Sequence, residues 1–362
     1  MYRLASFLLI IVVLSSCSKD DPSEFMWEKT KGSGTVYDTK IVDDTLFLLA
    51  GTSDSKPLFL KSSDGGKTDF IYAPELTGAF TAIAEDGAGY YLAGTSGNEL
   101  LITHLDLEGA EVWDTLINVS TDVQVAQIDW LDSEYLMVIG SSHPDSLSSS
   151  SFELVIIDTN GDISEASIAS PGFYTSITGL KVVSAAEIFV SITKNYGAGK
   201  SLSSVARITS EGSIIWETEL FNNPSYAAAS NSLSELNGML YISGSLERIA
   251  DDEILINSFV ASLTLSGILG NKEFLENSNS GSDTDFNSSG DIAVLNRNCL
   301  ILSIGAIPIG EDISRFRVLD ACDSYNTATL GLSLSADGDG NYLIGGSLGG
   351  KFYYALRSGP KE

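Results

Sequence analysis

Short apolar runs separated by turn residues make up this chain from about residue 25 to its end. Gly, Asp, Asn and Ser interrupt the runs throughout, and no long stretch shows the apolar period of an amphipathic helix. Runs of this kind, bounded by turn residues, are typical of β-strands. The pattern therefore predicts an all-β chain.

One run recurs as several apolar residues followed by Gly and then Thr or Ser. The fourth and sixth copies lack the glycine, and we align Ile192 and Ile304 with it there. The seven copies are centred on Gly51, Gly94, Gly140, Ile192, Gly244, Ile304 and Gly346. Their spacing of roughly 42 to 60 residues is the length of a four-stranded propeller blade. We expect each copy to be the second of four strands, named A to D in chain order.

The two ends of the chain carry complementary parts of one repeat. Two predicted D strands contain a tryptophan followed by an acid and Thr, at Trp113 and Trp216, and the N-terminal segment has a similar pattern at Trp27. The last repeat stops near Leu356, where its D strand is due. We therefore expect residues near 25 to 31 to complete the last blade and close the ring, which would protect two sheet edges.

These observations predict one domain over residues 25–362. The expected fold class is all-β, a seven-bladed β-propeller of four-stranded antiparallel blades. The repeat resembles that of secreted bacterial propellers with a Tyr-Leu-Ala-Gly-Thr run, an Asp-x-x-Gly turn and a Trp. In addition, the segment from Ser62 to Thr68 resembles the Asp-box of sialidases and of many non-enzymatic propellers. That resemblance implies a structural turn between strands C and D, away from any catalytic face.

The N-terminus resembles that of a bacterial lipoprotein. A weakly basic start is followed by an apolar run over residues 4–14, which has the length of a signal-peptide core and is too short to span a bilayer. The run ends in Leu14, Ser15, Ser16 and Cys17, which resemble a lipobox. The resemblance implies cleavage before Cys17 and acylation of its thiol with fatty acids such as palmitate. The alternative is an ordinary signal peptide with an incidental cysteine.

The expected layout is a signal peptide over residues 1–16 and a polar tether over residues 17–24. The acidic residues that follow Cys17 resemble the surface-export signal of some Gram-negative lipoproteins, and Ser18 replaces the aspartate that retains such proteins in the inner membrane. We expect a lipid-anchored protein of the outer membrane, on the cell surface in preference to the periplasmic face.

Charge narrows the class of partner. The formal net charge is −28, which repels nucleic acid and anionic headgroups. We therefore expect no nucleic-acid partner and membrane contact only through the lipid anchor. The oligomeric state stays open.

Candidates for covalent or metal chemistry are few. Cys299 and Cys322 would face each other across a hairpin centred near residue 310, so a disulfide is expected, with two separate thiols as the alternative. Asp337, Asp339 and Asn341 alternate as calcium ligands do, but no distal Glu follows, so a turn is favoured. We expect no cofactor, with calcium as a weak alternative. The chain has only two histidines and no nucleophile elbow, so no catalytic residue is assigned.

The long, variable segments are predicted on one face of the ring. They are the B–C loops over residues 141–151, 194–202, 246–255 and 305–313 and a D–A loop over residues 276–286. Because functional residues concentrate on loops, this face is the expected binding face. The candidate binding residues there are His143, Asp145, Tyr196, Arg248, Asp251, Asp283, Asp285, Glu311 and Asp312. Drift of loops that merely tolerate insertion is the alternative.

The expected function is a non-enzymatic binding or scaffold module for an envelope protein or a glycan. One alternative is a carbohydrate-active enzyme, a glycoside hydrolase or sialidase-like protein, with carboxylates over the central channel. A second alternative is an outer-membrane assembly factor on the periplasmic side. The sequence itself names no ligand.

Overall fold

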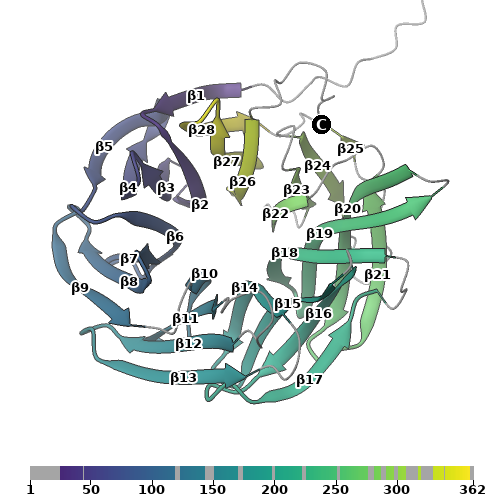
Figure 1. The fold of residues 1–362 in the computed structure, drawn as a ribbon. Helices are drawn as coiled ribbons and strands as arrows, with labels where there is room; N and C mark the ends of the chain where they lie inside the picture. The colour runs from purple at the N-terminus through teal and green to yellow at the C-terminus, as the bar shows by residue number, and fades with distance from the viewer. Residues whose placement is uncertain are drawn as a thin grey trace, which may run out of the picture.

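The computed structural model describes a ring of antiparallel sheets. The described residues are 25–43, 45–118, 123–142, 151–169, 174–197, 200–221, 226–250, 253–275, 281–286, 291–296, 301–306, 317–318, 329–337 and 339–358. Their strands form seven four-stranded sheets around a central axis (Figure 1). The fold is thus an all-β propeller of four-stranded antiparallel blades, as the repeat predicts.

We number the blades in chain order and assign the sheet that joins the two chain ends last. Blade 1 holds β2 (Gly34–Val42), β3 (Leu46–Ser53), β4 (Lys56–Ser63) and β5 (Lys67–Tyr72), with a short 3-10 turn η1 (Asp64–Gly66) between the last two. Blade 2 holds β6 (Gly78–Glu85), β7 (Gly89–Ser96), β8 (Glu99–Asp106) and β9 (Glu111–Asn118). Blade 3 holds β10 (Val123–Trp130), β11 (Tyr135–Ser142), β12 (Ser151–Asp158) and β13 (Ile163–Ala169). Blade 4 holds β14 (Tyr174–Ser184), β15 (Glu187–Gly197), β16 (Lys200–Ile208) and β17 (Ile214–Glu219).

The remaining blades follow the same plan. Blade 5 holds β18 (Tyr226–Leu236), β19 (Met239–Ala250), β20 (Glu253–Thr264) and β21 (Leu269–Leu275). Blade 6 holds β22 (Gly281–Phe286), β23 (Asp291–Asn296), β24 (Ile301–Ala306) and β25 (Arg317–Val318). Blade 7 holds β26 (Thr329–Ala336), β27 (Asn341–Leu348), β28 (Lys351–Ser358) and β1 (Phe25–Lys31). Blade 6 is the least complete sheet among the described residues, because its outer strand has only 2 residues.

The N-terminal strand closes the ring. β1 pairs antiparallel with β28, from Phe25 opposite Arg357 to Lys31 opposite Phe352. This is the closure that the tryptophan pattern at the two chain ends predicts. Blade 7 therefore contains strands from both ends of the chain, and separating β1 from β28 would leave its outer edge unpaired.

The core lies between neighbouring blades. Each junction contains its own cluster of buried apolar side chains. At several junctions an aromatic residue of the outer strand also covers a turn glycine of the next blade, since a Cβ built on that glycine would lie within 3.2 Å of the ring. These pairs are Trp27 with Gly66, Phe70 with Gly109, Trp113 with Gly161 and Trp216 with Gly267. The Trp and Gly repeats in the sequence therefore mark contacts between blades.

The glycine in the second strand of the repeat has a steric cause. The innermost strand of every blade has an irregularity in register at the same level, and in blades 1, 2, 3, 5 and 7 the repeat glycine lies opposite it. A Cβ on Gly51, Gly94 or Gly244 would come within about 2.1 Å of a backbone oxygen of the inner strand. Only a residue without a side chain fits such an approach.

Blade 6 corrects the predicted repeat register. Its second strand is β23, so residues 301–306 form the third strand, where the sequence pattern had suggested the second. Asn296 stands opposite the inner-strand irregularity, where most other blades have glycine. The missing glycine is why the pattern was aligned with the wrong strand.

Two predicted loops are also corrected. The segments over residues 194–202 and 246–255 are continuations of the β15–β16 and β19–β20 hairpins, with pairing as far as Gly197–Lys200 and Ala250–Glu253. Ladder hydrogen bonds there satisfy backbone groups that a loop would leave to water. Among the described residues no helix has the length and apolar character needed to cross a bilayer.

Candidate functional site

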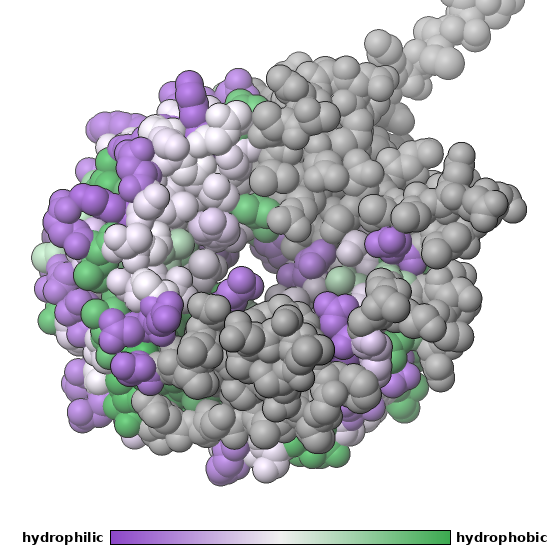
Figure 2. Space-filling view, viewed as in Figure 1, coloured by the Kyte–Doolittle hydropathy of each residue, from purple (hydrophilic) through white to green (hydrophobic). Residues whose placement is uncertain are grey.

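A polar cavity occupies the central channel. It has a volume of about 450 Å³ and is lined by all seven inner strands, β2, β6, β10, β14, β18, β22 and β26. The lining residues come from the middle and C-terminal half of each strand, which places the cavity toward the A–B turns. In the space-filling view hydrophilic residues border the opening at the centre of the ring (Figure 2).

The strand irregularities direct side chains into this cavity. At this level each inner strand skips one residue in its pairing with the second strand. Such bulges re-aim the side chain of the extra residue. The skipped residues that line the cavity are Tyr37, Thr81, Ala126, Thr178, Asn231 and Leu332. The cavity is therefore lined mainly by hydroxyl, amide and small apolar groups at this level.

Four aspartates of the cavity wall tie neighbouring blades together. In Asp129, Asp283 and Asp285 one carboxylate oxygen accepts the N–H of the next residue in its own strand, and the other accepts an N–H from the next blade. Asp38 also accepts an N–H across its junction. The donors across the junctions are Ile83 to Asp38 (2.7 Å), Val182 to Asp129 (2.9 Å), Leu334 to Asp283 (2.8 Å) and Ala336 to Asp285 (2.8 Å).

Hydroxyl groups complete this ring of contacts. The other junctions use Thr81 to the Val125 carbonyl (3.3 Å), Thr178 with Ser230 (3.0 Å), Ser232 with Thr284 (2.7 Å), and Ser333 to Thr39 (2.9 Å). The Ile41 N–H also donates to the Ser335 hydroxyl (3.0 Å). Every junction therefore has at least one polar contact beside the channel. Buried contacts of this kind specify how neighbouring elements pair.

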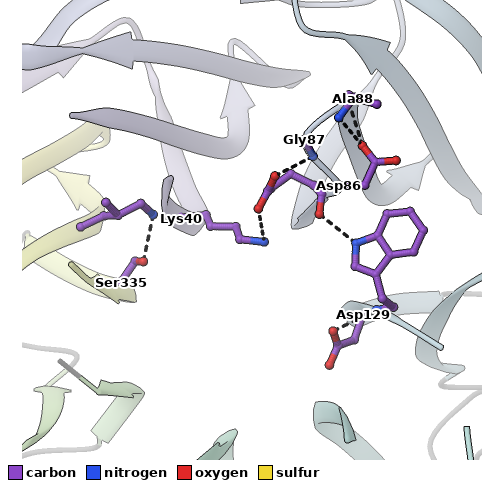
Figure 3. Close-up of polar contacts among 10 residues, drawn as sticks. Lys40, Asp86, Gly87, Ala88, Asp129 and Ser335 are labelled. Carbon is purple, nitrogen blue, oxygen red and sulfur yellow. Dashed lines mark hydrogen bonds and ion pairs between the residues drawn. The ribbon is translucent and has the colours of Figure 1, made fainter. Parts of the chain in front are cut away.

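Two lysines of the cavity are held by acids of neighbouring blades. Lys40 lies 3.4 Å from Glu85, and Lys181 lies 3.2 Å from Asp129. Figure 3 shows Lys40 and Asp129 in this part of the cavity wall. The Trp130 indole also donates to the Glu85 carbonyl (2.9 Å). Asp38, Asp283 and Asp285 have no such ion pair among the described residues.

Burial changes the acidity of these three carboxyls. It raises the pKa of Asp38 to about 7 and that of Asp285 to about 6. Burial also holds the pKa of Asp283 well above its ordinary value, with the Asp38 and Asp285 charges adding to the effect. The backbone N–H donors oppose the rise, because they stabilise the charged form. Asp38 and Asp285 therefore titrate near neutral pH.

Four of the sequence-predicted binding residues lie in the described part of the chain, and they belong to three different strands. Asp283 and Asp285 lie on the inner strand β22 and line the cavity, although the sequence had suggested a D–A loop. Tyr196 and Arg248 lie on β15 and β19, in the extended hairpins. The other candidates, His143, Asp145, Asp251, Glu311 and Asp312, lie outside the described residues, as do Leu14, Ser15, Ser16 and Cys17.

The strand pairing around the predicted disulfide has the expected register. Ser303 pairs with Val318 and Ile304 with Arg317, which is the facing pattern expected around residue 310. The strands concerned are the third and fourth of blade 6, where the second and third were expected. Cys299 and Cys322 themselves lie outside the described residues, so the bond stays a prediction.

The weak calcium candidate forms the turn between β26 and β27. The Asp337 carboxylate accepts the N–H groups of Asp339 (2.9 Å) and Asn341 (2.7 Å) and the side-chain amide of Asn341 (2.7 Å). Both of its oxygens are thus engaged in building the turn. No group of three or more His, Cys, Asp or Glu in the described part of the chain is arranged to hold a metal.

The Asp-box-like segment forms the turn between β4 and β5, where the resemblance places it. The Ser62 hydroxyl donates to the Lys67 carbonyl (3.0 Å) across this turn.

Sequence reasoning missed the cavity-lining part of the inner strands. The bulged residues carry no pattern of their own, because each is one extra position within an ordinary apolar run. The glycine opposite the bulge was a usable signal, because a glycine that recurs within strands indicates a close approach of the neighbouring backbone.

Comparison with solved structures supports the fold. Similar chains include the WD40 domain of Neurospora crassa Pan2, with 10% identity and a TM-score of 0.62 over 95% of this chain and 97% of that one. YCF48 bound to a D1 peptide has 12% identity and a TM-score of 0.55, covering 93% and 95% of the two chains. A streptogramin B lyase has 14% identity and a TM-score of 0.54, covering 91% and 97%.

At these identities the likenesses establish the propeller architecture and nothing about ligands. No family model matches the chain. No curated protein matches it either. The chain is a β-propeller built of repeated four-stranded blades.

Proposed function

We propose that this protein is a non-enzymatic binding propeller of the bacterial envelope, anchored to the outer membrane through Cys17, whose central channel receives a segment of a protein partner. One observation carries the proposal: the inner strands of all the sheets direct polar side chains into one cavity of about 450 Å³. Ligand cavities commonly have volumes in this range.

The composition of the cavity suits an extended peptide. Hydroxyl and amide groups of Thr81, Thr178 and Asn231 can exchange hydrogen bonds with a peptide backbone, and Tyr37 adds an aromatic ring that is 38% exposed. Aromatic side chains of this kind are common anchors at interfaces. A similar propeller, YCF48, is bound to a D1 peptide in its solved structure, which supports a peptide as the ligand class.

The hydrogen bonding of the carboxylates favours binding over catalysis. A general acid must donate a proton, but the oxygens of Asp283 and Asp285 already accept backbone N–H groups. If either oxygen of Asp283 or Asp285 were protonated, its O–H group would face a backbone N–H, and that hydrogen bond would be lost. These groups are better suited to hold the ring together than to attack or protonate a substrate.

A carbohydrate-active enzyme is the second candidate. The observation in its favour is the pKa of about 7 at Asp38 and about 6 at Asp285 within one cavity, since glycosidases use a carboxylic acid of raised pKa beside a carboxylate. Hydrolysis of a glycan by the purified protein, abolished in Asp285→Asn and Asp38→Asn, would replace the binding proposal with this one.

The binding proposal predicts a specific effect of Tyr37→Ala. Partner captured from detergent-solubilised envelopes by the full-length lipidated protein should fall by about tenfold, because a cavity anchor typically contributes more than 1 kcal/mol. Quantitative mass spectrometry after cross-linking provides the measurement. A glycan array tested in parallel identifies a saccharide ligand if one exists.

The matched control is Tyr135→Ala. Tyr135 is 40% exposed, close to the value for Tyr37, and does not line the cavity. Equal capture by the two variants would show that the channel is not the binding site. If no captured protein depends on Tyr37 and no glycan binds, the binding function itself is refuted.

Cys17→Ser tests the anchor. We expect the variant to lose metabolic labelling with an alkyne palmitate analogue and to leave the membrane fraction, because acyl chains supply the membrane affinity. Whole-cell protease should digest the wild-type protein if it lies on the surface. A labelled, membrane-bound Cys17→Ser protein would contradict the lipoprotein assignment.

A further inference from the structure

The N-terminal strand enters the ring at the same level as the cavity. Ala336 of β26 lines the cavity and pairs with Tyr342 of β27. Tyr342 pairs in turn with Arg357 of β28, and Arg357 pairs with Phe25 of β1. Neighbouring strands are about 4.8 Å apart, so three strand spacings place the start of β1 roughly 14 Å from the channel wall. The chain that precedes Phe25 therefore leaves the ring on the side of the A–B turns.

The cavity lies at this same end of the channel. Its lining includes the last residue of three inner strands, Trp130 of β10, Phe286 of β22 and Ala336 of β26. In β2 and β6 the lining begins only at the fourth residue, which is Tyr37 or Thr81. The A–B connections have two to four residues. A ligand that enters past these short turns therefore reaches the cavity directly.

The proposed anchor lies close to the A–B side as well. Residues 17–24 separate the thiol of Cys17 from β1, and eight residues reach at most about 28 Å when fully extended. β1 has 7 residues, so the opposite side of the ring lies about 20 Å farther from the anchor. An inverted ring would require an almost fully extended tether, which costs conformational entropy. The tether therefore favours a ring whose A–B side faces the lipid.

We propose that the cavity opens toward the membrane that carries the anchor, and that its ligand is a segment of a protein embedded in that same membrane. This inference rests on the proposed function, because it needs both the anchor at Cys17 and a ligand in the channel. It places the binding mouth on the side of the short turns, opposite the B–C loops.

Distance and charge indicate this class of partner. The tether holds the A–B rim within about 28 Å of the lipid surface, so a short segment that projects from a membrane protein can reach the cavity. The net charge of −28 repels anionic headgroups, which leaves room for such a segment between the ring and the lipid. Anchoring both proteins in one membrane also raises their effective concentration.

Energy transfer to a rhodamine-labelled lipid tests the orientation. The full-length lipidated protein, with Cys299→Ser and Cys322→Ser, carries a donor fluorophore at Ala88→Cys or at Asn98→Cys and is inserted into phosphatidylethanolamine and phosphatidylglycerol vesicles. Both positions are exposed, Ala88 on the A–B turn of blade 2 and Asn98 on its B–C turn. We expect the Ala88 probe to lie about 20 Å closer to the lipid, which is the length of the strand between the two turns.

Equal transfer from the two probes, as an edge-on ring would give, would overturn the proposal. So would stronger transfer from the Asn98 probe. Insertion of about 20 Gly and Ser residues after Glu24 should remove the difference, because the tether then no longer limits the orientation of the ring. A difference that persists in the lengthened protein would contradict the tether as its cause.

Carbonate extraction tests the class of partner. Proteins whose cross-linked capture is lost in Tyr37→Ala should remain in the membrane pellet after a carbonate wash of wild-type envelopes, as integral membrane proteins do. A Tyr37-dependent partner that the wash releases would overturn this inference and leave the binding function intact. If no captured protein depends on Tyr37, the binding function itself is refuted, and this inference with it, whatever the orientation of the ring.

Discussion

Replacing Trp27 with alanine is expected to lower the free energy of unfolding by about 3 kcal/mol, one of the two largest effects we predict. The indole packs edge-on against Phe47 at 5.2 Å and against Tyr354 at 5.7 Å, and it covers the turn at Gly66. The substitution therefore removes packing on both sides of the seam between blades 7 and 1. Urea unfolding followed by circular dichroism provides the measurement.

Met26→Ala is the matched control on the same strand. Met26 is 57% exposed, so its loss should change the stability by less than about 0.5 kcal/mol. Equal stabilities for the two variants would mean that the N-terminal strand contributes nothing to the fold through its tryptophan.

Gly94→Val should have the second large effect, a loss of about 3 kcal/mol or more. A Cβ at this position would lie 1.9 Å from the Ala79 carbonyl oxygen and 2.7 Å from the Phe80 Cα. The clash is with backbone, so no side-chain rotation relieves it, and the inner strand of blade 2 would have to move. Thermal and urea unfolding of the purified variant provide the measurement.

Gly97→Ala distinguishes this clash from a general cost of losing glycine. Gly97 has a φ of +60 and open space around it, so alanine there should cost about 1 kcal/mol through backbone strain alone. If Gly94→Val costs no more than Gly97→Ala, the close approach of the two strands is not present in solution.

The sequence predicted the fold wherever one physical constraint repeated. Glycine opposite the inner-strand bulge and tryptophan over the next turn both arise from contacts that recur from blade to blade, so they left a readable period. The partner of Trp27 could be inferred because the C-terminal repeat lacked the strand that the N-terminus supplies.

The candidate site was less accessible to sequence reasoning. Asp283 and Asp285 lie in a stretch rich in Ser, Gly and Asp, which reads as a loop, yet tertiary contacts hold it as an inner strand. An inner strand can hold these carboxylates at the channel wall because N–H groups of the next blade donate hydrogen bonds to them. Because these donors are distant in sequence, the local sequence pattern does not reveal them.

The extended hairpins of blades 4 and 5 were missed for a related reason. The segment around Tyr196 has Gly and Lys on either side and no apolar alternation, so nothing local indicates a strand. Pairing with the neighbouring strand extends it beyond the apolar core. Strand ends depend on such partners more than on propensity.

The closed ring also gives the binding proposal its basis. Because β1 completes blade 7, the inner strands surround one cavity and face each other across it. Ligand entry concerns this space, so the binding proposal depends on the ring being closed.

An engineered disulfide between β1 and β28 tests that closure most directly. Glu28 and Ala355 are direct partners, and facing residues of an antiparallel pair are within disulfide reach. In a background with the three native cysteines replaced by serine, Glu28→Cys with Ala355→Cys should cross-link almost completely on mild oxidation, with a loss of two hydrogens by mass spectrometry. Glu28→Cys with Lys351→Cys, which are not partners, should remain reduced. Failure of the first pair to cross-link in the folded protein, or equal cross-linking of both pairs, would contradict a ring closed by the N-terminal strand.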